Sequence, residues 1–554
     1  MKIDLLFWEG EAETVPDWRC GASRRLKNNP RESSAIISSW IKRTDSDYVV
    51  FWDLRLPLPE EDQLRAVVNT PGHVWHAGLL LGTQELPRVI DYVDPGWLLS
   101  MNPQPMKTVT SWRLSPRACV LRTDVLRQMG APDAEFQTLQ GAWLDYGFRL
   151  LKGGVVLRHE PSLLTAAIAG VDQDRALPAS DEFRFVRNNF GRSWFYWSVF
   201  RSIFTLQDAP AAMASLFRFS QPVRWGRGCT FSSKELDQPV ATSALKKSVS
   251  VLIPTLRRYA YVWNTLEQLR DQTVPPFEII VVDQTPRSER QTGYRTHYAD
   301  LPLRVIEQDV MGQCTAWNAA LESAQGDFLL FLGDDADEIP ANFLEEFLRT
   351  MILCRADMVA STVEELDAVP PNPASPLLKI ADGFPIAMVR RDVLVRSGLM
   401  DYAFDRGARA DADLAVRCYL GGALMLQRKN LRVFHHRAPA GGLRTHRARV
   451  ITYASSRRKL THRHLPSATE IYLVRRHLSS TRVRETIWLR VLGTFSTRGG
   501  YFRKAIKVSL SAILLPHTLW VIRKNWNKAT TMLGEFPRIP QLSVQPRSSA
   551  TSRR

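Results

Sequence analysis

The chain has 554 residues, of which 45% are hydrophobic and 23% are charged. This length predicts two or three domains, and the composition excludes a wholly disordered chain. The formal net charge of +17 favours anionic partners, such as a diphosphate-bearing substrate, an acidic membrane surface or a nucleic acid.

The cysteines and the N-terminus both indicate a cytoplasmic protein. The six cysteines are widely scattered without a C-x-x-C pair, which predicts reduced thiols rather than a disulfide framework. The first residues, MKIDLLFWEGEAE, have a short apolar run that turns acidic at once and lacks the cleavage pattern of a signal peptide.

Residues 1–180 read as a first block, and residues 181–246 as a bridge to a second. The bridge contains an aromatic run over Ser193–Phe204, which is more typical of a domain-packing surface than of a ligand site. It ends in the polar stretch Lys234–Lys247, which is typical of a linker.

The second block alternates buried strands with helices. Apolar strand patterns cover Val249–Ile253, the stretch FEIIVVD that ends at Asp283, and the stretch DFLLFLG. Helical patterns cover Tyr261–Arg270 and Thr315–Ala324. Continuous apolar strands separated by helices predict an α/β fold, with a mostly parallel sheet covered on both faces.

Polar residues follow the ends of three of these strands. Pro254, Thr255 and Arg257 follow the first, Asp283 ends the second, and Asp334 with Asp335 follows the third. Ligands of such sheets bind outside the carboxyl ends of the strands. We therefore expect a binding site at this edge.

The acidic cluster Asp334, Asp335 and Asp337 has two interpretations. Clustered carboxylates at a strand end bind hard cations such as Mg²⁺ or Mn²⁺. Alternatively the cluster caps a helix over Ala341–Thr350, since Asp favours helix starts and Pro340 suits a first turn.

Three later segments carry further candidates. Asp411 and Asp413 precede a helical pattern, so Asp413 can cap the helix while Asp411 points into the cleft as a general base, although both can also be caps or surface charges. His435 and His436 end another strand, where a histidine can contact a metal or a phosphate. The glycine- and cation-rich stretch RAPAGGLRTHRAR after them either closes over a diphosphate or is a solvated loop.

The chain also contains an internal repeat. DYVVFWD matches DFLLFLG, VLRTDVLRQMG matches MVRRDVLVRSG, and WLDYGFRLLKGG matches DADLAVRCYLGG, all in the same order. The period is too long for a solenoid and predicts two related domains.

Several segments of the second half together resemble the family 2 type of inverting glycosyltransferases, which have the GT-A fold. The matching segments are VSVLIPT with Arg257, IIVVDQT with Asp283, the stretch from Gly312 to Asn318 before GDFLLFLGDD, RRDVLVRSGLMDYAF, and DADLAVR. The resemblance covers about residues 247–440 and implies two GT-A-like domains.

The resemblance implies a role for each matching residue. The residues it assigns to a nucleotide-sugar donor are Pro254, Thr255, Arg257, Asp283, Gly312, Asn318 and Asp334. Those it assigns to a divalent cation, Mn²⁺ or Mg²⁺, are Asp335, Asp337 and His435, with Asp334 as an alternative carboxylate ligand and His436 as an alternative to His435. Asp411 would deprotonate the acceptor hydroxyl, which then attacks the anomeric carbon with inversion.

The chain departs from the family pattern in both halves. The second half has Gly333 where the family often has Asp, Ala410 where an acid often precedes the base, and Trp317 where Arg is usual. In the first half, Leu54-Arg55 stands where the second has Asp334-Asp335, and Trp143 replaces Asp411. An Arg repels a cation, so we predict that the first half is a non-catalytic copy.

We therefore expect residues 247–445 to be the catalytic domain of a transferase that moves sugar to a glycan or polyprenyl-linked acceptor in surface polysaccharide biosynthesis. An alternative is a carbohydrate-binding scaffold of two inactive domains. A phosphohydrolase or nuclease is disfavoured, because a second set of metal ligands and an aromatic-basic nucleic-acid signature are both missing from the sequence.

Residues 446–535 form a basic region that we expect to be helical, and residues 536–554 an expected disordered tail. The segment Ala505–Ile522 contains Lys507, Pro516 and His517, which argues against a membrane span. It predicts either an interfacial helix on an anionic membrane or a proline-kinked core helix.

Overall fold

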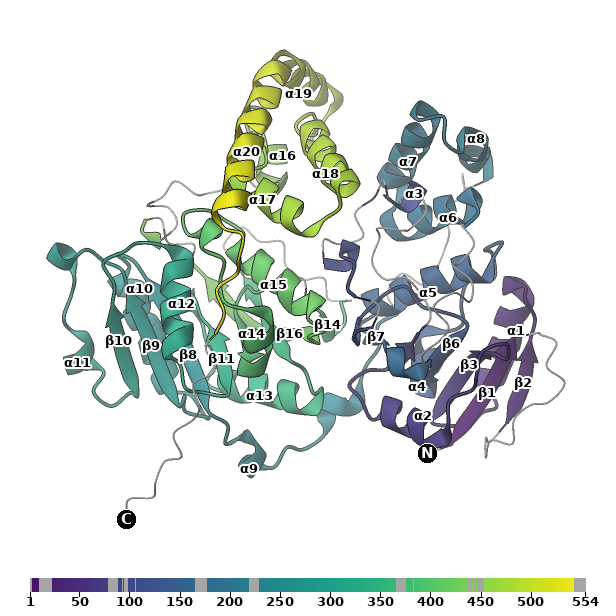
Figure 1. The fold of residues 1–554 in the computed structure, drawn as a ribbon, viewed down its shortest axis with the longest axis horizontal. Coiled ribbons are helices and arrows are strands. Elements are labelled where there is room, and N and C mark those ends of the chain that lie inside the picture. The colour runs from purple at the N-terminus through teal and green to yellow at the C-terminus, as the bar shows by residue number, and fades with distance from the viewer. Residues whose placement is uncertain are drawn as a thin grey trace.

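The computed structural model describes residues 2–8, 22–77, 88–91, 93, 98–104, 106–164, 177–218, 229–364, 375–381, 383–436, 438, 440–442, 445 and 453–542. Two α/β domains lie side by side, each built on one sheet, and a group of helices stands at the same end of each (Figure 1). The predicted α/β class and helical C-terminal region are confirmed.

The first domain has a seven-stranded sheet. Its strands, in spatial order, are β2 (Ser23–Leu26), β1 (Ile3–Trp8), β3 (Tyr48–Asp53), β6 (Ala118–Arg122), β4 (Val74–His76), β7 (Leu157–His159) and β5 (Val109–Thr110). Its helices are α1 (Pro30–Ile41), α2 (Glu61–Val68), α3 (Arg88–Asp91), α4 (Thr123–Met129) and α5 (Leu139–Lys152). The strands are apolar on both faces because helices cover both.

The bridge forms a helical arm above the first domain (Figure 1). It consists of α6 (Ala179–Phe190), α7 (Arg192–Phe204) and α8 (Ala209–Arg218). The aromatic run lies on α7, where Phe195 and Val199 are buried in the core of the first domain. Tyr196, Phe200 and Phe204 of the same helix are exposed, so one face of the run packs and the other does not.

The second domain has a nine-stranded sheet. Its strands, in spatial order, are β10 (Leu303–Glu307), β9 (Glu278–Asp283), β8 (Val249–Thr255), β11 (Phe328–Phe331), β15 (Ala387–Arg390), β13 (Met358–Glu364), β16 (Met425–His435) and β12 (Ala336–Asp337), with β14 (Leu378–Ile380) beside β16. β10 through β11 are parallel, and β15 is antiparallel to both of its neighbours.

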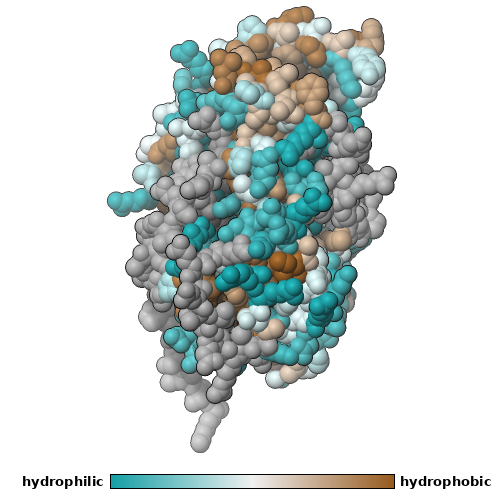
Figure 2. Space-filling view, turned by 90° about the vertical axis from the view of Figure 1, so that its right-hand side faces the viewer, coloured by the Kyte–Doolittle hydropathy of each residue, from teal (hydrophilic) through white to brown (hydrophobic). Residues whose placement is uncertain are grey.

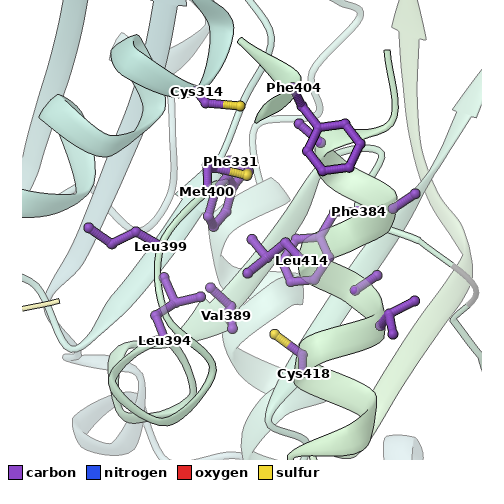
Figure 3. Close-up of a cluster of buried hydrophobic side chains, with 14 of the residues drawn as sticks. Cys314, Phe331, Phe384, Val389, Leu394, Leu399, Met400, Phe404, Leu414 and Cys418 are labelled. Atoms are coloured by element: carbon purple, nitrogen blue, oxygen red, sulfur yellow. The ribbon is translucent and has the colours of Figure 1, made fainter. Parts of the chain in front are cut away.

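Helices cover both faces of this second sheet. They are α10 (Tyr259–Arg270), α11 (Tyr294–His297), α12 (Gln313–Ser323), α13 (Phe343–Leu353), α14 (Arg391–Ser397) and α15 (Ala410–Leu420), after the short α9 (Thr242–Leu245). Apolar side chains such as Phe331 of β11, Leu394 of α14 and Leu414 of α15 meet in the core of one face (Figure 3). Each fully buried Leu or Phe stabilises the fold by roughly 1.5–3 kcal/mol, so this core fixes the starts of α12 and α15 beside the strand ends.

The two sheets share one strand plan. The order β2-β1-β3-β6-β4-β7 repeats as β9-β8-β11-β15-β13-β16, with the same directions at every step. β5 and β14 then stand at equivalent places, each antiparallel to the last strand. The second sheet adds β10 and β12, for which the described first sheet has no equivalent.

Local details of the sequence repeat agree as well. Asp145 of α5 and Asp413 of α15 each pair with the arginine four residues later. The helices α4 and α14 both end at a glycine with positive φ, 73° at Gly130 and 80° at Gly398. Glycine adopts this conformation without steric cost, which explains its place at the end of both helices.

The C-terminal region forms the second arm. Its helices are α16 (Tyr453–Arg458), α17 (Ala468–His477), α18 (Ser480–Gly493), α19 (Tyr501–Ile513) and α20 (Leu515–Glu535). No single described helix is long and apolar enough to cross a membrane, whereas α19 and α20 together pass that test but are bent by 58°. The segment Ala505–Ile522 is therefore two helices, broken just before Pro516 rather than kinked within one.

The residues after α20 differ from the expected disordered tail. Residues 536–542 pack along the second domain, where the Leu399 amide donates to the Pro540 carbonyl and Leu542 is buried. The rest of the predicted tail, residues 543–554, lies outside the described residues.

Candidate active site

A pocket of about 510 Å³ opens at the carboxyl ends of β8 and β11. The parallel part of the sheet predicts a site at this edge. The elements that line it are the end of β8, the segment after β11, the starts of α12 and α15, and the end of β16. The residues with polar or aromatic side chains among its lining are Thr255, Arg258, Gln284, Gln313, Trp317, Phe331, Asp334, Asp335, Phe384, Arg409, Asp411 and His435.

Asp334 and Asp335 lie on the pocket floor and are almost fully buried. The Thr255 hydroxyl donates to Asp334 at 2.9 Å, and the Arg258 guanidinium donates to the other oxygen of Asp334 at 2.9 Å. The same guanidinium is 3.6 Å from Asp335. Burial, opposed by Arg258 and aided by the charge of Asp335, raises the pKa of Asp334 to about 6.

Asp335, also on the pocket floor, contacts His435. Its carboxylate is 3.0 Å from His435 Nε2 and accepts the Ala438 amide at 2.8 Å. Burial alone would raise the pKa of Asp335, but His435, the amide and Arg258 outweigh it and lower the pKa to about 2. The carboxylate is therefore ionised at every physiological pH.

The structure does not bring Asp337 into this pocket. Asp337 lies in β12, and its carboxylate accepts from Asn264 and Gln268 of α10, at 2.9 Å each. Its other oxygen is 2.7 Å from His436 Nε2. Asp335 with His435 and Asp337 with His436 are thus two separate carboxylate–imidazole pairs.

The side chains on the pocket floor supply only part of the ligands that a divalent cation needs. Asp335 and His435 are a carboxylate and an imidazole, both suited to Mn²⁺, and both line the pocket. Within the described part of the chain, no three His, Cys, Asp or Glu side chains are placed to hold a cation by themselves. Mg²⁺-type sites commonly use one or two carboxylates with substrate phosphates, and this pair fits that arrangement.

Asp411 lies across the pocket from these acids, in the first turn of α15. Arg409, at the start of the helix, has φ 89° and ψ 17°, a left-handed conformation that is rare for a side-chain-bearing residue. Its guanidinium donates to Glu470 of α17 at 3.1 Å, and Glu470 also forms the capping box of that helix with Ser467. The C-terminal arm thereby fixes the turn that presents Asp411.

Asp413 has a structural role. It is fully buried, and its carboxylate is 2.8 Å from Arg417 and 2.7 Å from His477 of α17. Asp413 therefore pairs with Arg417 within α15 and ties this helix to the C-terminal arm through the contact with His477, and it makes no side-chain hydrogen bond as a helix cap.

Two predicted donor-binding residues, Asp283 and Arg257, do not line the pocket. Asp283 is fully buried, with its carboxylate accepting the Tyr259 hydroxyl at 2.8 Å and the Thr285 amide at 2.9 Å. Arg257, with φ 57°, pairs with Glu289 at 2.8 Å on the surface. Both shape the loop after β8.

Gly312 and Asn318 hold the start of α12 in place. The Gln284 side chain donates to the Gly312 carbonyl at 3.0 Å, and a Cβ at Gly312 would meet the Asp405 carboxyl at 2.4 Å. Asn318 is buried and exchanges two hydrogen bonds with the Met400 backbone, of 2.9 and 2.8 Å. Of the predicted donor-binding residues, Pro254, Thr255 and Asp334 line the pocket.

Several lining residues were not predicted as site residues: Arg258, Gln284, Gln313, Phe384 and Arg409. Arg258 directly follows Arg257 in the sequence, and it is the Arg258 side chain that lines the pocket. Trp317, noted only as a departure, packs on Phe331 with ring centroids 5.0 Å apart. For Phe384 no motif in the sequence gave a signal.

The site is thus a pocket of an α/β domain, with an ionised carboxylate–imidazole pair on one side and a separate carboxylate on a helix start on the other. Residues 250–374, which include β11 and all of β8 except Val249, match the family model described as glycosyl transferase family 2. This part of the chain is therefore similar to family 2 glycosyltransferases.

Curated relatives match the chain over a similar length. The putative glycosyltransferase EpsH of Bacillus subtilis (strain 168) is 32% identical over 105 residues, which is 19% of this chain and 30% of EpsH. The putative teichuronic acid biosynthesis glycosyltransferase TuaG of the same organism is 31% identical over 109 residues, 19% of this chain and 43% of TuaG. The chain spans less than half the length of these relatives.

Similar solved structures include a mannosyltransferase, PcManGT of Pyrobaculum calidifontis, in complex with GDP-Man and Mn²⁺. It is 16% identical, with a TM-score of 0.34, covering 54% of this chain and 91% of its own. Residues 1–349 of S. aureus TarS in complex with UDP-GlcNAc are 16% identical, with a TM-score of 0.33, covering 52% of this chain and 80% of TarS 1–349.

Proposed function

We propose that the second domain is an inverting glycosyltransferase that moves a sugar from a nucleotide-sugar donor to a hydroxyl of a glycan or lipid-linked acceptor. The observation that carries the proposal is the pocket itself, with Asp335 and His435 on its floor and Asp411 across from them. The family 2 match over residues 250–374 supports it.

The donor would lie between β8 and the start of α12. Arg258 faces the floor of the pocket and also donates to the Ala440 and Gly441 carbonyls, so it is held where a diphosphate would arrive. Asp335 and His435 would hold a divalent cation, which when bound neutralises the charge that develops on the leaving diphosphate. Trp317 and Phe331 offer an aromatic wall beside them.

Asp411 would act as the general base. An acceptor hydroxyl attacks the anomeric carbon, the bond from that carbon to the diphosphate oxygen breaks, and Asp411 takes the hydroxyl proton. The nucleoside diphosphate leaves on the opposite side, which gives inversion. The left-handed turn at Arg409 and its tie to Glu470 hold the carboxylate ready for this step.

We further propose that the first domain is a non-catalytic copy of the second. The shared strand plan and the matched Asp145–Arg149 and Asp413–Arg417 pairs support a common origin. At the place of Asp335 the first domain has Arg55, which is bonded to Asp53 at 2.6 and 2.9 Å.

We also propose that the chain acts in surface polysaccharide biosynthesis, at the cytoplasmic face of an anionic membrane. Support comes from α19, which exposes the apolar side chains of Phe502 and Ile513 together with the basic side chains of Arg503 and Lys504. An exposed helix surface that combines apolar and basic side chains fits an anionic membrane surface. Flotation with phosphatidylglycerol vesicles tests it: F502E/I513E should abolish binding, and equal binding by that variant and the parent would refute membrane docking.

A thermal-shift screen of UDP-, GDP- and dTDP-sugars with Mn²⁺ tests the transferase proposal. One nucleotide sugar should raise the unfolding midpoint, because a ligand that binds only the folded state stabilises it by about 2.7 kcal/mol at a hundred times its Kd. Failure of every donor to bind, in the presence of Mn²⁺ or Mg²⁺, would favour the scaffold alternative.

A further inference from the structure

A second cavity, of about 450 Å³, lies on the other side of Asp411. It shares Arg409 and Asp411 with the first pocket, so the carboxylate proposed as the base faces both spaces. A base that deprotonates an acceptor must contact the acceptor on one side and the reacting centre on the other. The second cavity is therefore placed where an acceptor would lie.

Both domains form this cavity. Ser100 and Met101, at the end of a short 3₁₀ helix of the first domain (Leu98–Ser100), line the cavity together with residues of α15, α17 and α18. Arg482 of α18 donates to the Ser100 hydroxyl and the Val93 carbonyl, at 3.4 Å each. The first domain also contacts the helix of Asp411 directly, through the Tyr419 hydroxyl, which donates to the Thr110 carbonyl at 3.0 Å.

A third cavity, of about 620 Å³, adjoins the second between the two helical arms. The two cavities share Arg482, Thr486 and Arg490 of α18. Trp194 and Trp197 of α7 line the far side of the third cavity. The three spaces form a row that leads from the donor pocket, past Asp411, to the two arms.

The row combines apolar and charged side chains. The wall of the second cavity includes the apolar side chains of Met101, Leu473 and Ile487 and the ion pair of Arg409 with Glu470. Arg490 lines both the second and the third cavity and contacts His464 Nδ1 at 3.1 Å. Besides Asp411, the carboxylates that line these cavities are Glu470 and Glu485, which pair with Arg409 and Arg201 instead, so the Arg490 guanidinium remains available to an anion.

The row ends at exposed apolar side chains. Around the third cavity lie the rings of Trp194 and Trp197, and beyond them Phe200 and Phe204 of α7 are 56% and 73% exposed. Figure 2 shows apolar side chains gathered at the top of the molecule, the end that carries the arm α6–α8. Trp488 of α18 is also exposed, at 56%.

We infer that this row of cavities is the acceptor site and that the acceptor is a lipid-linked sugar phosphate or diphosphate. This inference rests on the proposed glycosyltransferase function. The sugar hydroxyl lies at Asp411, the phosphate group lies at Arg490, and the apolar chain runs between the arms along Trp194 and Trp197. The first domain then serves the reaction by completing the acceptor site.

Isothermal titration of the full chain with farnesyl diphosphate tests the inference, with UDP, GDP and Mn²⁺ in excess to fill the donor pocket. The parent should bind the probe. Arg490→Gln should weaken it about tenfold or more, because a charge-assisted hydrogen bond is lost. Arg490→Lys, which keeps the charge, should recover most of the affinity, which separates binding from folding. Thr486→Trp should also weaken binding of farnesyl diphosphate, because the larger side chain narrows the junction of the second and third cavities.

Arg484→Gln is the matched control, because Arg484 is exposed on the same helix and lines neither cavity. It should bind the probe as the parent does. Equal binding by the Arg490→Gln and parent proteins, or binding of inorganic diphosphate as tight as that of farnesyl diphosphate, would overturn the lipid-linked acceptor. If the parent binds a nucleotide sugar but not farnesyl diphosphate, this inference fails while the transferase proposal stands.

Discussion

The two domains have the same strand plan but different chemistry at the same edge of the sheet. After β11 the chain continues into Asp334 and Asp335, which line a pocket. After β3 it continues into Leu54 and Arg55, and Arg55 turns back onto Asp53. The sheet order does not depend on which of these residues follows the strand, so the fold and the site are separable properties of this chain.

The helix starts show the same contrast. Asp411 at the start of α15 is open to two cavities. Trp143, its counterpart in α5, is fully buried and packs edge-on against Phe51 and Trp8, with ring centroids 4.8 and 6.0 Å apart. If the first domain is the copy that we propose, an aromatic side chain stands in it where the second domain has a side chain that faces cavities.

The largest expected effect is on catalysis by the second domain. Asp411→Asn should lower the transfer rate by about 10²–10⁴-fold, because an amide cannot accept the hydroxyl proton. Asp62→Asn, at an exposed acid of the first domain, should leave the rate unchanged. The measurement is release of nucleoside diphosphate with a donor found by the thermal-shift screen; transfer by Asp411→Asn at the parent rate would remove Asp411 from the mechanism.

At the same position of the first domain, the effect should fall on stability instead. Trp143→Ala should cost about 3–5 kcal/mol in the free energy of unfolding, because it empties a packed core site. Asp411→Ala should change that free energy by only about 0.5 kcal/mol, since its side chain faces two cavities instead of filling a packed core. Urea unfolding followed by tryptophan fluorescence measures both, and equal losses would contradict the contrast between a filled and an open position.

The sequence predicted the scaffold well because its signals are local. The apolar strands, the helix over Thr315–Ala324 and the ordered repeat all depend on residues close together in the chain. They predicted the α/β class and the edge at which Thr255 and Asp334 meet, which the structure describes. They also placed Asp411 beside the pocket, although its role remains a prediction.

The predicted site residues that lie outside the pocket are held there by tertiary contacts. Asp337 follows the acidic pair by two residues, but the pairing of β12 with β16 directs it to Asn264 of α10. Asp283 ends a strand like the other candidates, yet the Tyr259 hydroxyl holds its carboxylate inside. The acceptor-side cavity involves residues as distant as Met101 and Arg490, which no spacing rule links.

A smaller effect should follow from removing one member of the carboxylate–imidazole pair. Asp335→Asn should lower cation affinity by about 10–100-fold, by analogy with losses seen when groups that orient metal ligands are changed. Arg55→Ala, at the matching position of the first domain, should leave the dependence on Mn²⁺ unchanged. Titration of activity with Mn²⁺ compares the two, and an unaltered requirement in Asp335→Asn would show that this side chain does not hold the cation.

The smallest change is a shift in the pH dependence. The protein around Asp411 raises the pKa of its carboxyl, and this desolvation outweighs the Ala412 amide and Arg409, which lower it. A base must be ionised, so kcat/KM should be constant at high pH and fall about tenfold per unit below the pKa. The midpoint should lie above about 3.9, the ordinary value for Asp. Arg409→Gln should move it further upward by removing a nearby positive charge. A midpoint at or below the ordinary value would mean that a group other than Asp411 takes the proton. An upward shift of the midpoint in Arg409→Gln would show that the pH profile reports on the start of α15, the position at which the first domain has Trp143.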